Sequence, residues 1–231
     1  IRAVMITGDH PDTALAIASK VGICHQASQL LRGDELEEMT DEELLSRLDL
    51  THVFARVTPF HKVRLVRLFQ SKGHIVAMTG DGVNDAPALK AADIGCAMGR
   101  SGTDVAREAS DLILMDDNFS TIVSAIELGR GIFDNIKKAV HFLLSCNIGE
   151  IMTLFFAMLL GYKVPLLPVQ LLFVNLVTDS FPALCLGMEP PEPDVMSSPG
   201  KSRHHAIFSF SSLFEIITQG MFLGSLALTA Y

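Results

Sequence analysis

The sequence predicts an α/β domain with a parallel sheet, followed by transmembrane α-helices. Short apolar runs alternate with helical patterns over residues 1–118, which is typical of a parallel sheet with covering helices. Charged residues then become rare: 35 of the first 138 residues are Asp, Glu, Lys or Arg, against 9 of the last 93. A soluble domain is usually about one quarter charged, so only the first part fits one. Three apolar stretches in the second part are long enough to cross a bilayer, for which about 20 residues suffice.

Five short apolar runs in the first part are predicted strands: residues 3–7, 52–55, 75–79, 94–98 and 112–115. Helices are predicted after Pro11 and from Pro59 to residue 72, because proline favours the first helical turn. The acidic stretch 33–50 has leucines at helical spacing, and we predict that it is a surface excursion. In a parallel sheet the loops at the carboxyl ends of the strands carry the chemistry.

Two acidic loops that contain glycine follow predicted strands. They are Thr7-Gly8-Asp9 after the first strand and Gly80-Asp81-Gly82-Val83-Asn84-Asp85 after the third. Glycine lets the backbone turn sharply and approach a ligand closely, and Asp81 is a hard oxygen ligand that suits Mg²⁺. Asn84 and Asp85 open a helix, whose N-terminus favours anions. The alternative is that both loops merely cap helices.

Lys62 lies between these loops in the sequence, at the start of the predicted helix after Pro59. It is either a solvated surface lysine or a point charge that contacts a phosphoryl group. Neither loop is a P-loop, because no Gly-Lys-Ser/Thr follows, and the third glycine of a dinucleotide fingerprint is missing.

The predicted spans are residues 139–162, 166–188 and 210–231, and the stretch 119–138 is predicted to be a helical stalk that continues into the first span. Lysine and arginine flank the first span and lie between the second and third. The positive-inside rule therefore places residues 1–138 and 189–209 in the cytoplasm and makes the chain a multi-pass membrane protein.

Five polar side chains within the first two spans could form a cation site: Asn147, Glu150, Asn175, Thr178 and Asp179. The first two share one helix face and the last three share another. A carboxylate inside a span usually marks an ion path, although hydrogen bonds between helices would explain the neutral side chains. Pro182 cannot donate to the carbonyl of Thr178, so we predict a broken helix there.

Several motifs together resemble P-type cation-transporting ATPases. In the first part they are MITGD at residues 5–9, ARVTPFHK at 55–62, MTGDGVNDAPALK at 78–90 and the run 116–138. In the spans, Asn147-Ile-Gly-Glu150 and Asn175-Leu-Val-Thr178-Asp179, followed by Pro182, are most similar to the sarco/endoplasmic-reticulum-type calcium ATPases. The resemblance implies a haloacid-dehalogenase-like, Rossmann-type domain fragment before the membrane helices.

The resemblance also implies roles for particular residues. Asp81 would bind Mg²⁺, and Gly80 and Gly82 would bind the cofactor. The catalytic set would be Thr7, Gly8, Asp9, Lys62, Asn84 and Asp85, with Asp85 holding Lys62 in place. Asn147, Glu150, Asn175, Thr178 and Asp179 would bind the transported cation.

The implied protein is an ATP-driven pump, most simply for Ca²⁺, that works through an aspartyl phosphate. Its cofactors would be Mg²⁺ and ATP, and its partners membrane lipid, the nucleotide-binding and actuator domains, and further membrane helices. The family's acceptor motif Asp-Lys-Thr-Gly-Thr does not occur in this sequence, and the chain does not begin with Met. We therefore expect a piece of a longer pump that is inactive alone.

Three alternatives remain open. The chain could be a membrane-anchored phosphatase of the haloacid-dehalogenase type, a truncated product that only binds partners, or part of a pump for Na⁺, Mn²⁺ or H⁺. Nucleic acid is not expected as a partner, because the formal net charge is −8 and no basic stripe is present.

Overall fold

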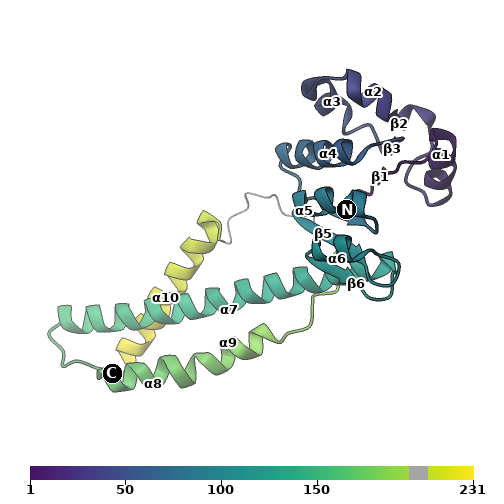
Figure 1. The fold of residues 1–231 in the computed structure, drawn as a ribbon. Coiled ribbons are helices and arrows are strands. Elements are labelled where there is room, and N and C mark those ends of the chain that lie inside the picture. The colour runs from purple at the N-terminus through teal and green to yellow at the C-terminus, as the bar shows by residue number, and fades with distance from the viewer. Residues whose placement is uncertain (198–207) are drawn as a thin grey trace. The chain divides into compact units, whose positions relative to one another are not determined.

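A computed structural model describes residues 1–197 and 208–231 (Figure 1). Part of the predicted loop 189–209 therefore lies outside the described residues. The basic residues at 201–205 all fall in that part. The chain divides into two compact units, the first ending at Ile122 and the second beginning at Val123.

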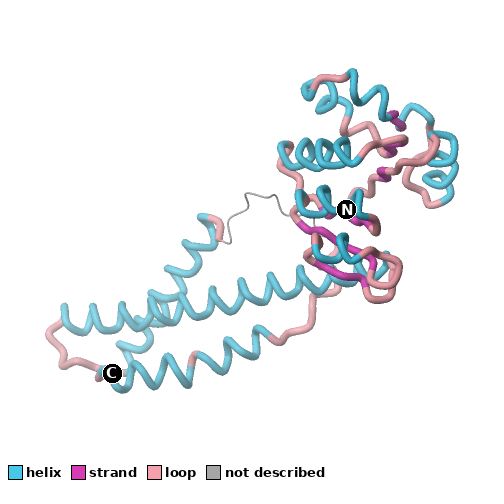
Figure 2. Tube along the Cα trace, in the orientation of Figure 1, coloured by secondary structure: helices cyan, strands magenta, loops and turns pink. Residues whose placement is uncertain are grey.

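The first unit contains six short strands, which form two three-stranded parallel sheets (Figure 2). The strands are β1 (Met5–Ile6), β2 (Leu30–Arg32), β3 (Val53–Ala55), β4 (Ala77–Gly80), β5 (Ile94–Met98) and β6 (Leu112–Leu114). Their orders are β1-β3-β2 and β4-β5-β6, so β1 and β4 are each an edge strand. The predicted parallel α/β fold is confirmed, with its strands divided between two sheets, and β2 was not predicted.

Six α-helices connect these strands: α1 (Pro11–Lys20), α2 (Gly33–Glu38), α3 (Asp41–Arg47), α4 (Pro59–Ser71), α5 (Ala86–Ala91) and α6 (Asp104–Glu108). Short 3₁₀ turns lie at Ala27–Gln29 and Val83–Asp85. The start of α4 follows from its sequence, because Pro59 occupies the first turn and the Thr58 hydroxyl accepts from the His61 N–H. This start places Lys62 in the first turn of α4.

The stretch 33–50 is not a surface excursion, so that prediction was wrong. Leu36, Leu44 and Leu48 are fully buried and pack with Phe54 of β3 in one core cluster. The leucine spacing was read correctly as helical, but α2 and α3 turn that face inward. Burial of apolar surface favours this arrangement at about 25 cal/mol per Å².

The Phe54→Ala chain is expected to lose about 3–5 kcal/mol of unfolding free energy, because a fully buried aromatic side chain would leave a cavity. Denaturant unfolding of the chain in detergent micelles measures this loss. The matched control is Phe60→Ala, whose ring is 74% exposed and whose loss should stay within about 0.5 kcal/mol. Equal losses for the two variants would contradict the core assignment.

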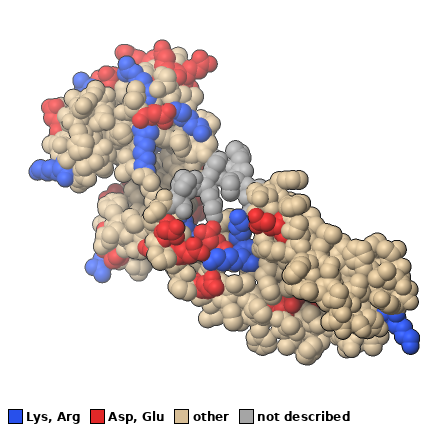
Figure 3. All heavy atoms as spheres, turned by 180° about the vertical axis from the view of Figure 1, so that it is seen from behind, with Lys and Arg blue, Asp and Glu red and all other residues tan. Residues whose placement is uncertain are grey.

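The second unit is helical and its visible surface carries few charged side chains (Figure 3). Its elements are α7 (Phe119–Leu159), α8 (Pro168–Phe173), a π-helical segment (Val174–Thr178), α9 (Ser180–Gly187) and α10 (Phe210–Ala230). By length and composition, three helical stretches of the described chain could cross a membrane: Phe119–Leu159, Pro168–Gly187 and Phe210–Ala230. The helix α7 runs without interruption from the predicted stalk into the first predicted span.

The predicted break at Thr178 is a wide turn instead. The Asp179 N–H donates to the Val174 carbonyl five residues earlier, at 3.0 Å, and the helix then resumes as α9. Pro182 still has no backbone N–H to donate, but the π turn accommodates the proline without ending the helix. Such turns are frequent at functional sites.

Small residues bring α10 into close contact with α7. A Cβ atom on Gly220 would lie 2.5 Å from Ile148 Cγ2, and one on Gly224 would lie 2.8 Å from the Gly149 carbonyl oxygen. Close backbone approach at small residues is typical of membrane helix pairs. The contact is next to Glu150, so it fixes α7 at the level of the predicted cation site.

Candidate functional site

A cavity of about 410 Å³ lies where the carboxyl ends of β1 and β4 meet, within the first unit. Its lining combines loops from both sheets: Ile6, Thr7, Gly8, Lys62, Thr79, Gly80, Asp81, Asp85, Met98, Ser101, Asp117 and Phe119. Carboxyl ends of parallel strands are where open α/β sheets bind ligands. The cavity is therefore in the place that the strand pattern predicts.

Lys62 and Asp85 form an ion pair at one side of this cavity. Lys62 Nζ lies 2.5 Å from Asp85 Oδ1, and the two side chains are only 16% and 10% exposed. The other oxygen, Asp85 Oδ2, accepts from the backbone N–H groups of Asp81 at 3.3 Å and Gly82 at 3.2 Å. One carboxylate thus fixes the lysine to the loop after β4. Gly80 is required beside it, because a Cβ there would lie 2.5 Å from the Asp85 Cβ.

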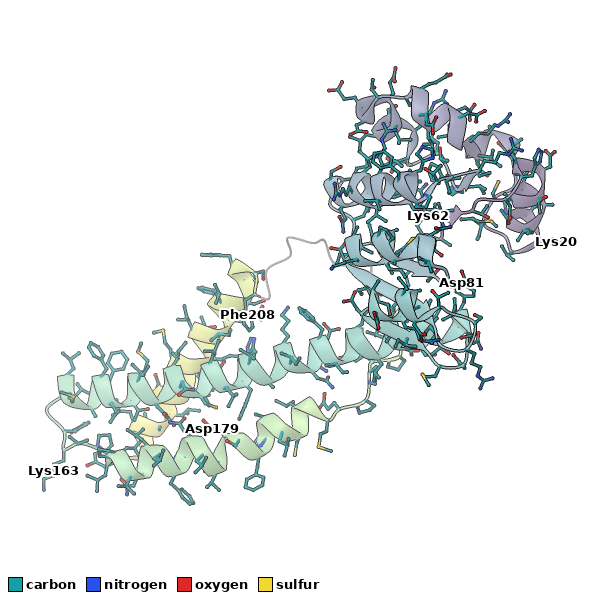
Figure 4. The ribbon with its side chains drawn as sticks, in the orientation of Figure 1. Lys20, Lys62, Asp81, Lys163, Asp179 and Phe208 are labelled. Atoms are coloured by element: carbon teal, nitrogen blue, oxygen red, sulfur yellow. The ribbon has the colours of Figure 1, made fainter. Side chains whose placement is uncertain are left out.

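The Asp81 side chain, labelled in Figure 4, is exposed and lines the cavity in the same loop as Asp85. No described residue hydrogen-bonds to it or forms an ion pair with it. Mg²⁺ in phosphoryl-transfer sites takes one or two carboxylates together with phosphate oxygens and waters. Among the described residues no group of three or more His, Cys, Asp or Glu could hold a metal. Asp81 therefore fits a Mg²⁺ whose remaining ligands come with a phosphate-bearing substrate.

The two other loop residues with carboxylate or hydroxyl groups interact with each other. Thr7 Oγ1 donates to Asp9 Oδ2 at 2.9 Å, and the Asp9 N–H donates to Thr7 Oγ1 at 3.2 Å. Thr7 lines the cavity whereas Asp9 does not. Asn84 and Gly82 are likewise absent from the lining, and Asn84 is exposed.

The structure thus brings six of the predicted residues of the first unit to one cavity: Thr7, Gly8, Lys62, Gly80, Asp81 and Asp85. The sequence reasoning missed Ser101 and Asp117. A signal for both was available, because each follows a predicted strand, 94–98 and 112–115 respectively. The rule used for the loops after β1 and β4 applies equally to them.

In the second unit, α7 and the π-helical segment bring polar side chains together. Asn175 Nδ2 donates to Glu150 Oε2 at 3.1 Å. Asp179 is only 5% exposed. Glu150 Oε1 and Asp179 Oδ2 are both buried without a hydrogen-bond partner among the described residues. Unpaired buried carboxylate oxygens are costly, and a bound cation would remove that cost.

Two of the five predicted membrane residues are not part of this group. Asn147 is exposed, and its amide donates to the Leu143 carbonyl of its own helix at 2.8 Å. Thr178 is also exposed, and no described residue hydrogen-bonds to its hydroxyl. Helical spacing predicts which residues share a face, but not the direction of each side chain.

Comparison with known proteins gives a consistent picture for both units. Residues 1–93 match the family model of haloacid dehalogenase-like hydrolases, and residues 163–231 match that of the C-terminus of cation transporting ATPases. The chain belongs to the P-type cation-transporting ATPases, which are integral membrane proteins that cross the bilayer several times.

Within that family the chain is similar to calcium-transporting ATPases. It is 55% identical over 231 residues to calcium-transporting ATPase 1 of Bacillus cereus and 49% identical over 231 residues to the calcium-transporting ATPase of Bacillus subtilis. It is 46% identical over 228 residues to the endoplasmic reticulum-type calcium-transporting ATPase 4 of Arabidopsis thaliana. These alignments cover 97–100% of this chain but only 22–26% of the relatives. The chain thus spans about a quarter of their length.

Proposed function

We propose that this chain supplies the phosphoryl-transfer pocket and part of the cation path of an ATP-driven Ca²⁺ pump. The observation that carries the proposal is the pair of buried, unpartnered carboxylate oxygens on Glu150 and Asp179. A transmembrane anchor needs no such oxygens, whereas a path for a hard cation does. The names of the relatives favour Ca²⁺ over Na⁺, Mn²⁺ or H⁺.

The phosphoryl step in this proposal uses an acceptor aspartate from elsewhere in the pump. A carboxylate oxygen of the acceptor attacks the γ-phosphorus of ATP while the bond to the β–γ bridging oxygen breaks and ADP leaves. Lys62 offsets the charge on the transferring group, and Asp85 holds Lys62 in place. The Thr7 hydroxyl, which donates to Asp9 in this structure, would exchange that bond for one to a phosphoryl oxygen. Mg²⁺ held by Asp81 would supply further charge neutralisation.

The sheet edges suggest how the acceptor reaches the cavity. β1 and β4 are edge strands of separate parallel sheets, and their carboxyl ends line the same cavity. We propose that a further parallel strand of the whole pump pairs with both edges and carries the acceptor at its own carboxyl end. That strand would also join the two sheets into one.

The proposed domain organisation is a phosphorylation-domain part (1–118), a stalk (119–138), a transmembrane hairpin (139–188), a loop (189–209) and a third transmembrane helix (210–231). Residues 1–138 and 189–209 would face the cytoplasm. Because α7 is unbroken from Phe119 to Leu159, we propose that it carries movement of the phosphorylation domain to Glu150.

Phosphoenzyme formation tests this function. The complete pump, incubated with γ-labelled ATP, Mg²⁺ and Ca²⁺, is expected to form an acid-stable phosphoenzyme whose label hydroxylamine releases, as expected for an acyl phosphate. The chain alone is expected to take up no label, because it lacks the acceptor motif.

Two outcomes would contradict the proposal. Label that forms equally well without Ca²⁺ would favour the membrane-anchored phosphatase. Label incorporated by the chain alone would show that the acceptor lies within these residues.

A further inference from the structure

Asp117 lies at the cavity, two residues before the start of α7, and the proposed mechanism gives it no role. Its carboxylate accepts from three consecutive backbone N–H groups of the loop after β5. Oδ1 accepts from Gly99 at 2.8 Å and from Arg100 at 2.9 Å, and Oδ2 accepts from Ser101 at 2.8 Å. These bonds, with the Arg100 N–H the largest cause, lower the pKa of Asp117 to about 2. The carboxylate is therefore ionised wherever the protein works.

The other side of this loop is held by Arg107. Its Nη1 donates to the carbonyl oxygens of Gly99 at 2.9 Å and Gly102 at 2.7 Å. Gly102 is also closed against β5, because a Cβ there would lie 2.1 Å from the Met98 carbonyl oxygen. The loop's N–H groups thus bind Asp117, and two of the loop's carbonyl oxygens bind Arg107. The backbone of residues 99–102 is therefore held from both sides.

The end of the loop contacts the predicted Mg²⁺ ligand. The Thr103 N–H donates to the backbone carbonyl of Asp81 at 2.8 Å. Residues 99–103 therefore form a bridge from the Asp117 carboxylate to the backbone of Asp81. Partners outside the coordination sphere that orient a ligand typically change metal affinity by about 10–100-fold when removed.

We propose that Asp117 is a positioning residue, which holds the loop 99–103 against Asp81 and thereby sets the affinity of the cavity for its divalent cation. The proposal rests on the proposed function for the identity of that cation. The backbone of Asp117 supports a dedicated role, because its φ is +54°, a conformation that non-glycine residues seldom adopt.

Two variants of the complete pump distinguish the effect of the Asp117 carboxylate from that of the backbone conformation at this position. Asp117→Gly removes all three acceptor contacts, and glycine adopts a positive φ without strain. Asp117→Asn keeps one oxygen for the Gly99 and Arg100 N–H groups but loses the contact to Ser101, and asparagine tolerates positive φ well. Asp116→Asn is the matched control, since among the described residues the Asp116 carboxylate accepts from the Asn118 N–H and the Thr121 hydroxyl and not from the loop 99–103.

The measurement is binding of Mn²⁺, followed by its paramagnetic resonance signal, without ATP turnover. Mn²⁺ binding that the parent shows and Asp81→Asn lacks is assigned to the cavity. Its dissociation constant is expected to rise about tenfold in Asp117→Gly, by less in Asp117→Asn, and not at all in Asp116→Asn. Hydrogen exchange at Arg100 and Ser101 should be faster in Asp117→Gly, whereas the Gly99 N–H keeps its bond to the Leu114 carbonyl.

An unchanged Mn²⁺ dissociation constant in Asp117→Gly would overturn the proposal, as would an equal change in Asp116→Asn. A lower unfolding temperature with unchanged Mn²⁺ affinity would also overturn it, because that is a structural role only. Both readouts are independent of phosphoenzyme formation. Failure of the pump assignment alone would therefore leave the Mn²⁺ series intact.

Discussion

The Asp81→Asn pump is expected to lose ATP turnover by about 10³-fold or more, which corresponds to ~4 kcal/mol of transition-state stabilisation. Among the described residues that line the cavity, Asp81 presents the one carboxylate without a protein partner, since Asp85 is paired with Lys62 and Asp117 accepts from three backbone N–H groups. An amide has the same shape but no negative charge for a divalent cation. Steady-state ATP hydrolysis measured over a range of Mg²⁺ concentrations checks this expectation.

Asp12→Asn is the control for this experiment. It makes the same carboxylate-to-amide change on α1, where the Asp12 side chain is 92% exposed, and it should leave turnover within about twofold of the parent. If Asp81→Asn retains turnover within tenfold of the parent, Asp81 is not the cation ligand. The chemistry of the cavity would then have to rest on Lys62 and Thr7.

The strand pattern was sufficient to predict the place of the cavity, because the carboxyl-end rule needs only the strand ends and not their order. The predicted strand 94–98 coincides with β5, whose five residues are apolar or small and largely buried. The order of the strands was beyond the pattern. The division into two sheets leaves no signal in the apolar pattern, and β2 contributes only two apolar residues, Leu30 and Leu31, before Arg32.

The contact of Asp117 with the loop after β5 could not be predicted, although its place after a strand could. Its contact with the loop after β5 depends on the pairing of β5 with β6, in which Met98 lies opposite Leu114. That register is a tertiary property, since pairing can slip without any change in the apolar pattern. Local sequence places Asp117 after a strand but does not place it against Gly99.

The membrane residues illustrate a second limit of sequence reasoning. Spacing predicts that Asn147 and Glu150 share a helix face, yet the Asn147 amide turns back to its own helix while Glu150 meets Asn175. Side-chain rotation is decided by the neighbours that a helix finds. Likewise Pro182 predicts a lost hydrogen bond, but not whether a π turn or a break accommodates the loss.

The Asp179→Asn pump is expected to need about 100-fold more Ca²⁺ for half-maximal activation of ATP hydrolysis, or ~2.7 kcal/mol of binding free energy. Ca²⁺ affinity depends strongly on the number of charged ligands, and Asp179 Oδ2 is buried with no described partner of its own. Ca²⁺ titration of ATP hydrolysis measures the shift. Glu215→Gln is the control, because it removes an exposed carboxylate from another span, α10, and should leave the half-activating concentration unchanged.

Thermal unfolding in detergent is an independent test of the role of Asp179. Without Ca²⁺, Asp179→Asn should be at least as stable as the parent, because it removes a buried carboxylate that lacks a partner. With Ca²⁺, the parent should gain stability by binding and the variant should not. If the Asp179 carboxylate had only a structural role, its loss would instead destabilise the protein, and by the same amount with and without Ca²⁺. That outcome, or an unchanged Ca²⁺ titration, would remove Asp179 from the cation path.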